Sequence, residues 1–284
     1  MNTNFIWHNG EYLPSEERSL YVDNRAFHFG DGFFESMRAI NGSVKFIANH
    51  FNRVIDTCKA LSINLPEGFT PKLLETQVND LLQKNQITQG GRIRITFFRK
   101  STGYYLPQGN DLDYVIETHP YDHNFFKIND NGKAVDIYPD VKKDINSLSM
   151  YKTLNCSLYI MASMHAVQKG LDDALIQNRR GTIIEGTSTN LFLASNGVLY
   201  TPSLDEGCIA GTMRMNVINI AIESGIKVYE CSLTPQNLLV ADEIFLTNAI
   251  KGVEWISSYR TKRYFNDMSK QMVDMLNKHV AETT

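Results

Sequence analysis

The stretch Thr182-Ile-Ile-Glu185-Gly-Thr-Ser-Thr-Asn190-Leu-Phe192 places a single carboxylate between two apolar, strand-like runs. Burying a charged carboxylate without a partner is costly, so Glu185 requires an explanation. Its partner could be a cationic side chain or the protonated ring nitrogen of a bound cofactor. Taken alone, such a glutamate is more often a structural acid, and both alternatives stand at this point.

Composition narrows the class of protein. The chain has 284 residues, of which 43% are hydrophobic and 21% are charged, with a net charge of -3. This is ordinary globular composition for one large domain or two medium ones, and it lacks the basic field expected of a nucleic-acid partner. We find no apolar run near the roughly 18–20 residues of a membrane span, and no basic-then-apolar secretory signal at the N-terminus.

The cysteines indicate the compartment. They lie far apart and form no CxxC pair: Cys58, Cys156, Cys208 and Cys231. This spacing predicts reduced thiols in a cytoplasmic protein, and neither a disulfide framework nor a zinc site.

The first 118 residues predict a small α+β domain. Residues 5–47 alternate between short apolar runs and the turn signals Asn9-Gly10 and Asn41-Gly42, which is typical of hairpins. The rest of this domain is expected to contain helices at about 47–61 and 71–83 and strands at 92–98 and 113–118.

Residues 119–132 form the best candidate for a linker between domains, because the segment is polar and contains Pro120 and Asn131-Gly132. Its His119-x-x-x-His123 spacing could suggest a metal site. The segment lacks a helical pattern and a third ligand, so no metal is predicted.

Residues 133–284 predict a second, larger domain. A long helix is expected over about 153–169, and it is closed by Gly170. The other expected elements are strands at 135–138, 174–177, 182–185, 191–194, 198–201, 226–230 and 243–247, and helices at about 212–224 and 266–280.

Three further features could carry chemistry together with Glu185. Lys152 stands just before the long helix. The run Cys208-Ile-Ala-Gly211-Thr-Met-Arg214 leads into another helix, whose N-terminal N–H groups suit a phosphate. Arg53 could grip a phosphate in a bidentate way. Each has a simpler explanation as a solvated side chain or an ordinary turn.

In combination these features resemble the class IV (fold-type IV) PLP-dependent aminotransferases, where PLP is pyridoxal 5'-phosphate. That family includes branched-chain aminotransferases, D-amino acid aminotransferases and aminodeoxychorismate lyase. The resemblance covers nearly the whole chain. The matching segments are Asn24-Arg-Ala-Phe-His-Phe-Gly-Asp-Gly-Phe-Phe-Glu35, His50-x-x-Arg53, Lys152-x-x-Asn155, Glu185-x-x-x-x-Asn190-Leu-Phe192, Ala210-Gly-Thr-Met-Arg214 and Ala241-Asp-Glu-Ile-Phe-Leu-Thr-Asn-Ala249.

The resemblance implies a role for each matching residue. Lys152 would form the Schiff base with PLP, and Glu185 would bind the pyridine nitrogen, which keeps the ring an electron sink. The other implied cofactor contacts are Arg53 and the backbone N–H groups of Thr212 and Met213 at the phosphate, Ile209 on the ring face, and Thr247, Asn248 and Ala249 near the phosphate and substrate.

The resemblance also implies the architecture. An α+β, two-domain fold is expected, with a small α/β-sandwich domain (1–118) and a larger PLP-binding domain (133–284) that has a β-barrel-like core. The cofactor would lie in the cleft between them, and the enzyme would be a homodimer.

The sequence leaves the reaction within the family open. An amino acid transaminase would move an amino group between an α-amino acid and a 2-oxo acid, whereas a lyase would release pyruvate and 4-aminobenzoate for folate synthesis. A homologue without turnover is disfavoured, because the lysine, the glutamate and the phosphate loop are intact. We predict a transaminase, with the lyase as the alternative. Candidate substrate-binding residues are Arg25, Phe34, Ser36, Arg99 and Arg179.

Overall fold

The structure is a computed structural model that describes residues 4–16 and 20–282. The chain divides into two compact units. Unit 1 comprises the chain up to Phe125 together with Tyr151–Asn155, and unit 2 comprises Phe126–Met150 and the chain from Cys156 onward.

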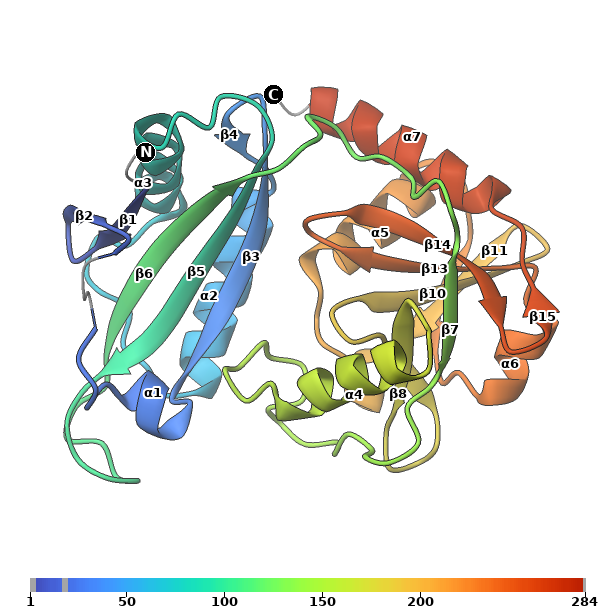
Figure 1. Ribbon diagram of the computed structural model, residues 1–284, viewed down its shortest axis with the longest axis horizontal. Helices are drawn as coiled ribbons and strands as arrows, with labels where there is room; N and C mark the ends of the chain where they lie inside the picture. The colour runs from blue at the N-terminus through green and yellow to red at the C-terminus, as the bar shows by residue number, and fades with distance from the viewer. Residues whose placement is uncertain (1–3, 17–19, 283–284) are drawn as a thin grey trace. The chain divides into compact units, whose positions relative to one another are not determined.

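Unit 1 contains a six-stranded antiparallel sheet in the order β2-β1-β6-β5-β3-β4 (Figure 1). Apolar and polar side chains alternate along the strand of residues 91–100, so the sheet has one apolar and one polar face. Ile93, Ile95 and Phe97 are buried, while Arg94 and Thr96 point to the opposite side. The strands are β1 (Phe5–His8), β2 (Glu11–Pro14), β3 (Gly32–Ile40), β4 (Ser43–Val44), β5 (Gly91–Lys100) and β6 (Asp111–Pro120).

Helices cover the apolar face of this sheet. They are α2 (Ile47–Ala60) and α3 (Pro71–Lys84), while the short α1 (Arg25–Phe29) precedes β3. The hydroxyl of Thr70 accepts a hydrogen bond from Leu73 N at 3.2 Å, so α3 begins where the sequence predicts. The core of unit 1 joins the helices to the sheet through Phe51, Val54, Leu74, Val78, Leu81, Met37, Ile93, Ile95, Phe97 and Ile116.

Tyr151–Asn155 belongs to unit 1, although the sequence assigned it to the larger domain. Phe34 N donates to Lys152 O at 3.0 Å, and Leu154 N donates to Gly32 O at 3.0 Å. These bonds extend the segment along the start of β3. The division near Phe125 falls inside the expected linker, but the first two residues of that linker end β6.

Unit 2 is built on a closed ring of six strands, which is the expected barrel-like core. The ring runs β10-β13-β14-β7-β8-β9, and β9 pairs back with β10. Its strands are β7 (Lys133–Ile137), β8 (Asp173–Gln177), β9 (Ile183–Glu185), β10 (Asn190–Ser195), β13 (Glu243–Asn248) and β14 (Gly252–Tyr259). Outside the ring, β11 (Val198–Pro202) and β12 (Val228–Cys231) extend from β10, and β15 (Lys262–Arg263) pairs with β14.

The helices of unit 2 are α4 (Ser157–Gln168), α5 (Thr212–Glu223), α6 (Pro235–Val240) and α7 (Asp267–Glu282), with a 3-10 turn at Leu204–Glu206. The helix α4 begins four residues later than predicted, because Tyr151–Asn155 is extended against β3. None of the helices in the described part of the chain is long and apolar enough to cross a bilayer.

Candidate active site

Glu185 lies in a row of polar residues that crosses three neighbouring strands of unit 2. It ends β9 and pairs with Asn190 at the start of β10, which in turn lies opposite Thr247 of β13. The four residues between Glu185 and Asn190 form the tight connection of β9 to β10. The spacing seen in the sequence therefore places the glutamate, the asparagine and the threonine side by side.

The buried carboxylate of Glu185, with only 2% of its side chain exposed, is held by three donors. Lys143 Nζ and Tyr159 Oη donate to its Oε1 at 2.7 and 2.8 Å, and the backbone N–H of Ile209 donates to Oε2 at 2.7 Å. Burial and the adjacent Glu185 charge raise the pKa of Tyr159, so this hydroxyl keeps its proton and donates it. Of the two partners considered for Glu185, the structure therefore shows one, a cationic side chain.

The loop before α5 is anchored to the same row. Asn190 Nδ2 donates to Ile209 O at 2.7 Å, so both the N–H and the C=O of that residue are held by the sheet. Gly211 is the N-cap of α5 and has no side chain to cap it. A Cβ at Gly211 would lie 1.9 Å from Asn190 Oδ1, which explains the glycine.

The N-terminus of α5 suits an anion. Its first residues, Thr212 and Met213, are both buried, and the helix dipole makes this end positive. Further along, Arg214 Nη2 donates to Pro202 O at 2.7 Å and to Glu230 at 2.5 Å, which fixes the helix against β11 and β12. Arg214 is therefore a structural residue of this loop.

Thr247 carries a buried hydroxyl that fits a ligand. Its side chain is 1% exposed, and its Oγ1 has no hydrogen-bond partner among the residues that the structure describes. An unsatisfied buried hydroxyl is costly, and a bound acceptor would remove that cost. Together with the carboxylate of Glu185 and the N-terminus of α5, it gives unit 2 groups that fit the ring nitrogen and phosphate of PLP.

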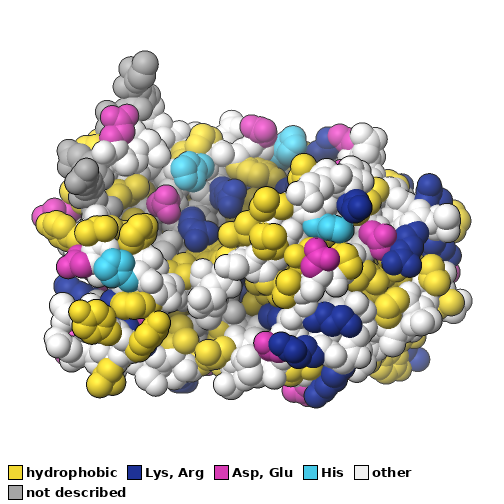
Figure 2. All heavy atoms as spheres, turned by 60° about the horizontal axis from the view of Figure 1, so that its bottom comes forward, with side chains coloured by type: hydrophobic (Ala, Val, Ile, Leu, Met, Phe, Trp, Pro, Cys, Tyr) yellow, Lys and Arg dark blue, Asp and Glu magenta, His cyan; other side chains and the backbone are white. Residues whose placement is uncertain are grey.

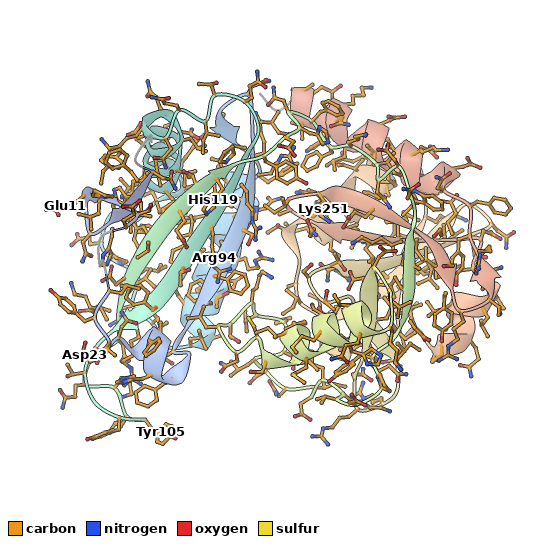
Figure 3. All side chains as sticks on the ribbon, viewed as in Figure 1. Glu11, Asp23, Arg94, Tyr105, His119 and Lys251 are labelled. Carbon is orange, nitrogen blue, oxygen red and sulfur yellow. The ribbon has the colours of Figure 1, made fainter. Side chains whose placement is uncertain are left out.

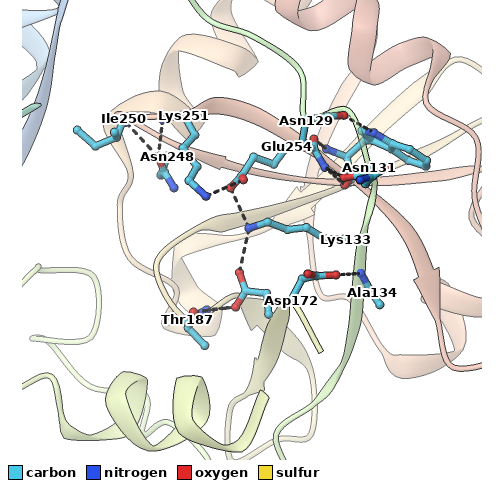
Figure 4. Close-up of polar contacts among 12 residues, drawn as sticks. Asn129, Asn131, Lys133, Ala134, Asp172, Thr187, Asn248, Ile250, Lys251 and Glu254 are labelled. Carbon is cyan, nitrogen blue, oxygen red and sulfur yellow. Dashed lines mark hydrogen bonds and ion pairs between the residues drawn. The ribbon is translucent and has the colours of Figure 1, made fainter. Parts of the chain in front are cut away.

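A partly buried ion network supports the turns on both sides of this row (Figure 4). Lys133 and Lys251 each donate to Glu254 at 2.9 Å, and Lys133 lies 3.9 Å from Asp173. Asp173 accepts hydrogen bonds from the N–H and the hydroxyl of Thr187, just after Glu185.

The same network reaches the turn after β13. Asn248 Oδ1 accepts from the N–H groups of Ile250 and Lys251 at 3.0 and 2.9 Å, which closes this turn and fixes Ala249 within it. The predicted cofactor residues Asn248 and Ala249 are therefore held in a defined turn by the side chain of Asn248 and the backbone N–H groups that follow it.

Within unit 1, Lys152 contacts an aromatic ring that it shares with an arginine. Its Nζ lies 4.4 Å from the centroid of the Phe34 ring, and Arg94 Cζ lies 4.0 Å from the same centroid. Arg94 comes from β5, where Figure 3 labels it, and pairs in register with Ser36 of β3. Two predicted substrate residues, Phe34 and Ser36, thus share one sheet face with Arg94, which the sequence analysis did not select.

Arg53 forms a buried ion pair that the sequence did not predict. Its Nε and Nη2 donate to the two oxygens of Glu35 at 2.7 and 2.6 Å, and His50 Nδ1 lies 2.6 Å from Glu35 Oε2. Burial by itself would raise the pKa of Glu35, but the charge of Arg53 and the hydrogen bond from His50 outweigh it and lower the pKa to about 2. This pairing orients the guanidinium group of Arg53.

The remaining candidate arginines are engaged within their own units. Arg99 donates to Asp31, to the backbone oxygens of Leu61 and Ser62, and to Asn110.

Arg25 donates to Asp31 and to the carbonyls of Gly103 and Tyr104, next to Tyr105, which Figure 3 shows extending from this loop. Arg179, at the turn between β8 and β9, is exposed and pairs with Asp144. These contacts favour structural roles for Arg25 and Arg99.

The histidines of the expected linker do not assemble a metal site in the described residues, where no group of three or more His, Cys, Asp or Glu side chains could hold a metal ion. The backbone oxygen of His123 instead accepts from Arg38, whose guanidinium stacks on Tyr121.

The sequence profile of the amino-transferase class IV family matches residues 32–259, which is more than half of the chain. The chain belongs to this family. It is therefore an enzyme of the class IV aminotransferase type, a PLP-dependent transaminase, and the predicted family, fold class and cofactor are confirmed.

Individual relatives agree with this assignment. The chain is 27% identical to the D-alanine aminotransferase of Staphylococcus haemolyticus over 252 residues, covering 86% of this chain and 84% of that protein. It is 27% identical to the branched-chain-amino-acid aminotransferase of Salmonella typhimurium over 268 residues, covering 89% and 84%. A branched-chain aminotransferase structure from Thermoproteus uzoniensis matches with a TM-score of 0.89 at 23% identity, covering 99% of this chain and 96% of that one.

Lys143, Tyr159 and Arg94 are candidate site residues that the sequence analysis did not select. Lys143 lies 42 residues before Glu185, and Tyr159 lies 26 residues before it. The strand pairing of the ring brings these segments together, and no local motif marks them. For Arg94, the available signal was a charged residue inside an alternating strand, facing away from the core.

Proposed function

We propose that the protein transfers an amino group between an α-amino acid and a 2-oxo acid, with Lys152 as the residue that binds the cofactor covalently and Glu185 as the partner of its ring nitrogen. The observation that carries this proposal is the row of Glu185, Asn190 and Thr247, which joins a buried carboxylate to an unsatisfied hydroxyl beside a glycine-capped helix N-terminus. Few structural roles require that combination.

Lys152 has two tasks in this proposal. PLP, when bound, supplies an electron sink for the bonds at the substrate's Cα. Lys152 holds the cofactor in the resting enzyme, and its Nζ then moves the proton at the substrate's Cα as a general base. Phe34, whose ring lies 4.4 Å from this Nζ, orients the lysine side chain.

The phosphate is assigned to groups that donate hydrogen bonds. The backbone N–H groups of Thr212 and Met213 open α5, and the hydroxyl of Thr247 lacks a partner among the described residues. Arg53, oriented by Glu35, supplies the charge. Ile209 would pack on the ring face, and the turn of Asn248 and Ala249 would border the phosphate and substrate.

For the substrate carboxylate, we favour Arg94 over the arginines selected from sequence. Arg94 and Lys152 contact the same Phe34 ring, so this cation lies in the same part of unit 1 as the reactive amine. Replacing Arg94 with methionine should raise KM for amino acids more than it lowers kcat.

A substrate panel tests the reaction type. The enzyme is incubated with L- and D-amino acids plus 2-oxoglutarate, and separately with aminodeoxychorismate. Amino transfer supports the proposal, and pyruvate release with 4-aminobenzoate would support the lyase instead. The matched variant Lys152→Ala should lose turnover in either assay, by at least about 10²–10⁴-fold from its proton-transfer role alone, while its thermal unfolding stays close to that of the wild type.

We also propose a cytoplasmic homodimer. The four cysteines are free thiols. One surface of α4 exposes Ile160, Met161, Met164 and Val167, an apolar stripe that a second copy would cover. Figure 2 shows hydrophobic side chains, in yellow, interspersed with charged ones on the face that it draws.

Sedimentation velocity tests the dimer. Met164→Glu, which adds a charge to the stripe on α4, should shift the protein toward monomer. Gln271→Glu, which adds the same charge at an exposed position of α7, should leave the dimer intact. A monomeric wild type, or a dimer that Met164→Glu leaves unchanged, would refute this interface.

A further inference from the structure

The Glu185 carboxylate has an unequal set of partners on its two oxygens. Oε1 accepts from Lys143 Nζ at 2.7 Å and from Tyr159 Oη at 2.8 Å, whereas Oε2 accepts only the N–H of Ile209, at 2.7 Å, among the described residues. A carboxylate oxygen has room for about two hydrogen bonds. Oε1 is therefore filled, and one acceptor position is left on Oε2.

We propose that Lys143 and Tyr159 are positioning residues for the cofactor: they fix the Glu185 carboxylate through Oε1 and turn the open acceptor position of Oε2 toward the ring nitrogen. This inference rests on the proposed function, because it assumes that Glu185 meets that nitrogen. It adds to that function two residues that lie outside the motifs of the sequence.

The charge balance around Glu185 supports the role of Lys143. A buried carboxylate without a counter-charge is costly, and a cation beside it offsets that cost. Lys143, whose side chain is 12% exposed, is the described cation in contact with Glu185. The two other titratable groups nearby stay neutral, since burial and the Glu185 charge raise the pKa values of Tyr159 and of Cys208, the latter to about 12.

The geometry of Tyr159 complements that of the lysine. Its hydroxyl comes from α4, whereas Lys143 comes from the segment after β7, so two separate elements fix Oε1. Lys143 Nζ also lies 5.4 Å from the centroid of the Tyr159 ring, which ties the two donors together. The carboxylate plane is thereby held by contacts on both of its oxygens.

A rival explanation predicts the opposite change in PLP affinity when Lys143 is removed. If Lys143 occupied the place of the ring nitrogen, it would compete with the cofactor for Glu185, and its removal would tighten PLP binding. A positioning lysine has the reverse effect, because its removal leaves a carboxylate that can rotate away from the cofactor. The direction of the change in PLP affinity therefore separates the two.

A double-mutant cycle on PLP binding tests the proposal. Apoenzyme is titrated with PLP, followed by cofactor absorbance, for wild type, Lys143→Met, Glu185→Gln and the double variant. We expect Lys143→Met to raise the Kd for PLP by about tenfold or more in the wild-type background and by less than about twofold in the Glu185→Gln background. An unchanged or tighter Kd, or the same loss in both backgrounds, would overturn the proposal.

Two variants serve as controls, and a third provides a second test. Lys143→Arg keeps the charge and should restore most of the affinity. Lys142→Met, at the neighbouring exposed position, should bind PLP as the wild type does. If Lys143→Met does not fold, Tyr159→Phe carries the test, because it removes one hydrogen bond and keeps the ring. It should weaken PLP binding only while Glu185 is present, and an equal loss in the Glu185→Gln background would overturn the proposal.

Failure of this inference is distinguishable from failure of the proposed function. Wild-type protein that binds no PLP would reject the function itself. Wild-type protein that binds PLP normally, combined with an unperturbed Lys143→Met variant, would reject only the role of Lys143.

Discussion

Two buried glutamates, one in each unit, have the same number of hydrogen-bond donors and different surroundings. Glu35, 1% exposed, receives its donors from His50 and Arg53, which are one turn apart on α2. Glu185, 2% exposed, receives one cation, one neutral hydroxyl and one backbone N–H, from three separate segments.

The difference teaches how to separate a structural acid from a ligand-binding acid. Glu35 joins β3 to α2 through two side chains of that helix, Arg53 and His50. Glu185 holds the peptide that leads into the N-terminus of α5, and it lies in the row of Thr247, whose buried hydroxyl lacks a partner in the described part of the chain. Removing the charge of Glu35 should therefore damage stability, and removing the charge of Glu185 should damage cofactor chemistry.

The largest expected effect is on the stability of Glu35→Gln. The substitution leaves the mostly buried guanidinium of Arg53 without its counter-charge, and breaking a buried pair in this way costs about 3–5 kcal/mol. Urea unfolding measures the loss. Asp130→Asn, which breaks an exposed pair with Lys127, should cost no more than about 1 kcal/mol; equal losses in the two variants would contradict the structural role of Glu35.

Glu185→Gln should lower kcat by about 10²–10³-fold, which is typical when one electrostatic contact to the reacting system is removed. Its unfolding free energy should change less than that of Glu35→Gln, because Glu35 accepts two hydrogen bonds from the guanidinium of Arg53 whereas Glu185 accepts one from Lys143. Steady-state kinetics and urea unfolding of the same preparations check both statements. Near wild-type turnover in Glu185→Gln would remove the distinction between the two glutamates.

Acid should affect Glu35 in a defined pH window. Its pKa in the folded protein is lowered to about 2 from an ordinary value of 4.5. Its contribution to the free energy of unfolding is therefore present above pH 4.5 and is lost as the pH falls toward 2. This difference in pKa corresponds to about 3 kcal/mol of unfolding free energy. Unfolding free energies measured from pH 6 down to pH 2 should show this decline, and Glu35→Gln should flatten it; an equally steep decline in the variant would count against this assignment.

The smallest expected effect concerns the loop that Glu185 holds. Gly211→Ala would place a methyl group 1.9 Å from Asn190 Oδ1 and displace the N-terminus of α5. We expect PLP affinity to fall by about tenfold, or 1.4 kcal/mol. Gly109→Ala, where the nearest atom to a new Cβ is 3.8 Å away, is the matched control and should bind PLP normally. Unaltered affinity in Gly211→Ala would show that this loop does not hold the phosphate.

Local motifs made much of the fold and site predictable. The alternation of β5, the caps of α3 and the glycine before α5 are short-range signals, and each element lies within a few residues of its predicted position. The lysine, the glutamate and the phosphate loop were recognised because the family motifs are contiguous in sequence.

What the sequence did not predict depends on long-range pairing. The carbonyl of Lys152 accepts a hydrogen bond from Phe34 N of β3, which lies far from it in the sequence. For this reason α4 begins later than predicted, and Lys152 belongs to unit 1. The strand β14 was missed because its burial does not alternate and its first residue is a glycine with positive φ. Lys143 became visible only once the ring of strands had closed beside Glu185.

The most direct test of the central claim is to reduce the PLP-loaded enzyme with borohydride and map the modified peptide by mass spectrometry. Both Lys143 and Lys152 are present, and the account assigns them different tasks: Lys143 pairs with Glu185, and Lys152 binds the cofactor covalently. We predict a phosphopyridoxyl group on Lys152 and none on Lys143. An unmodified protein, or a group found on Lys143 instead, would contradict the account.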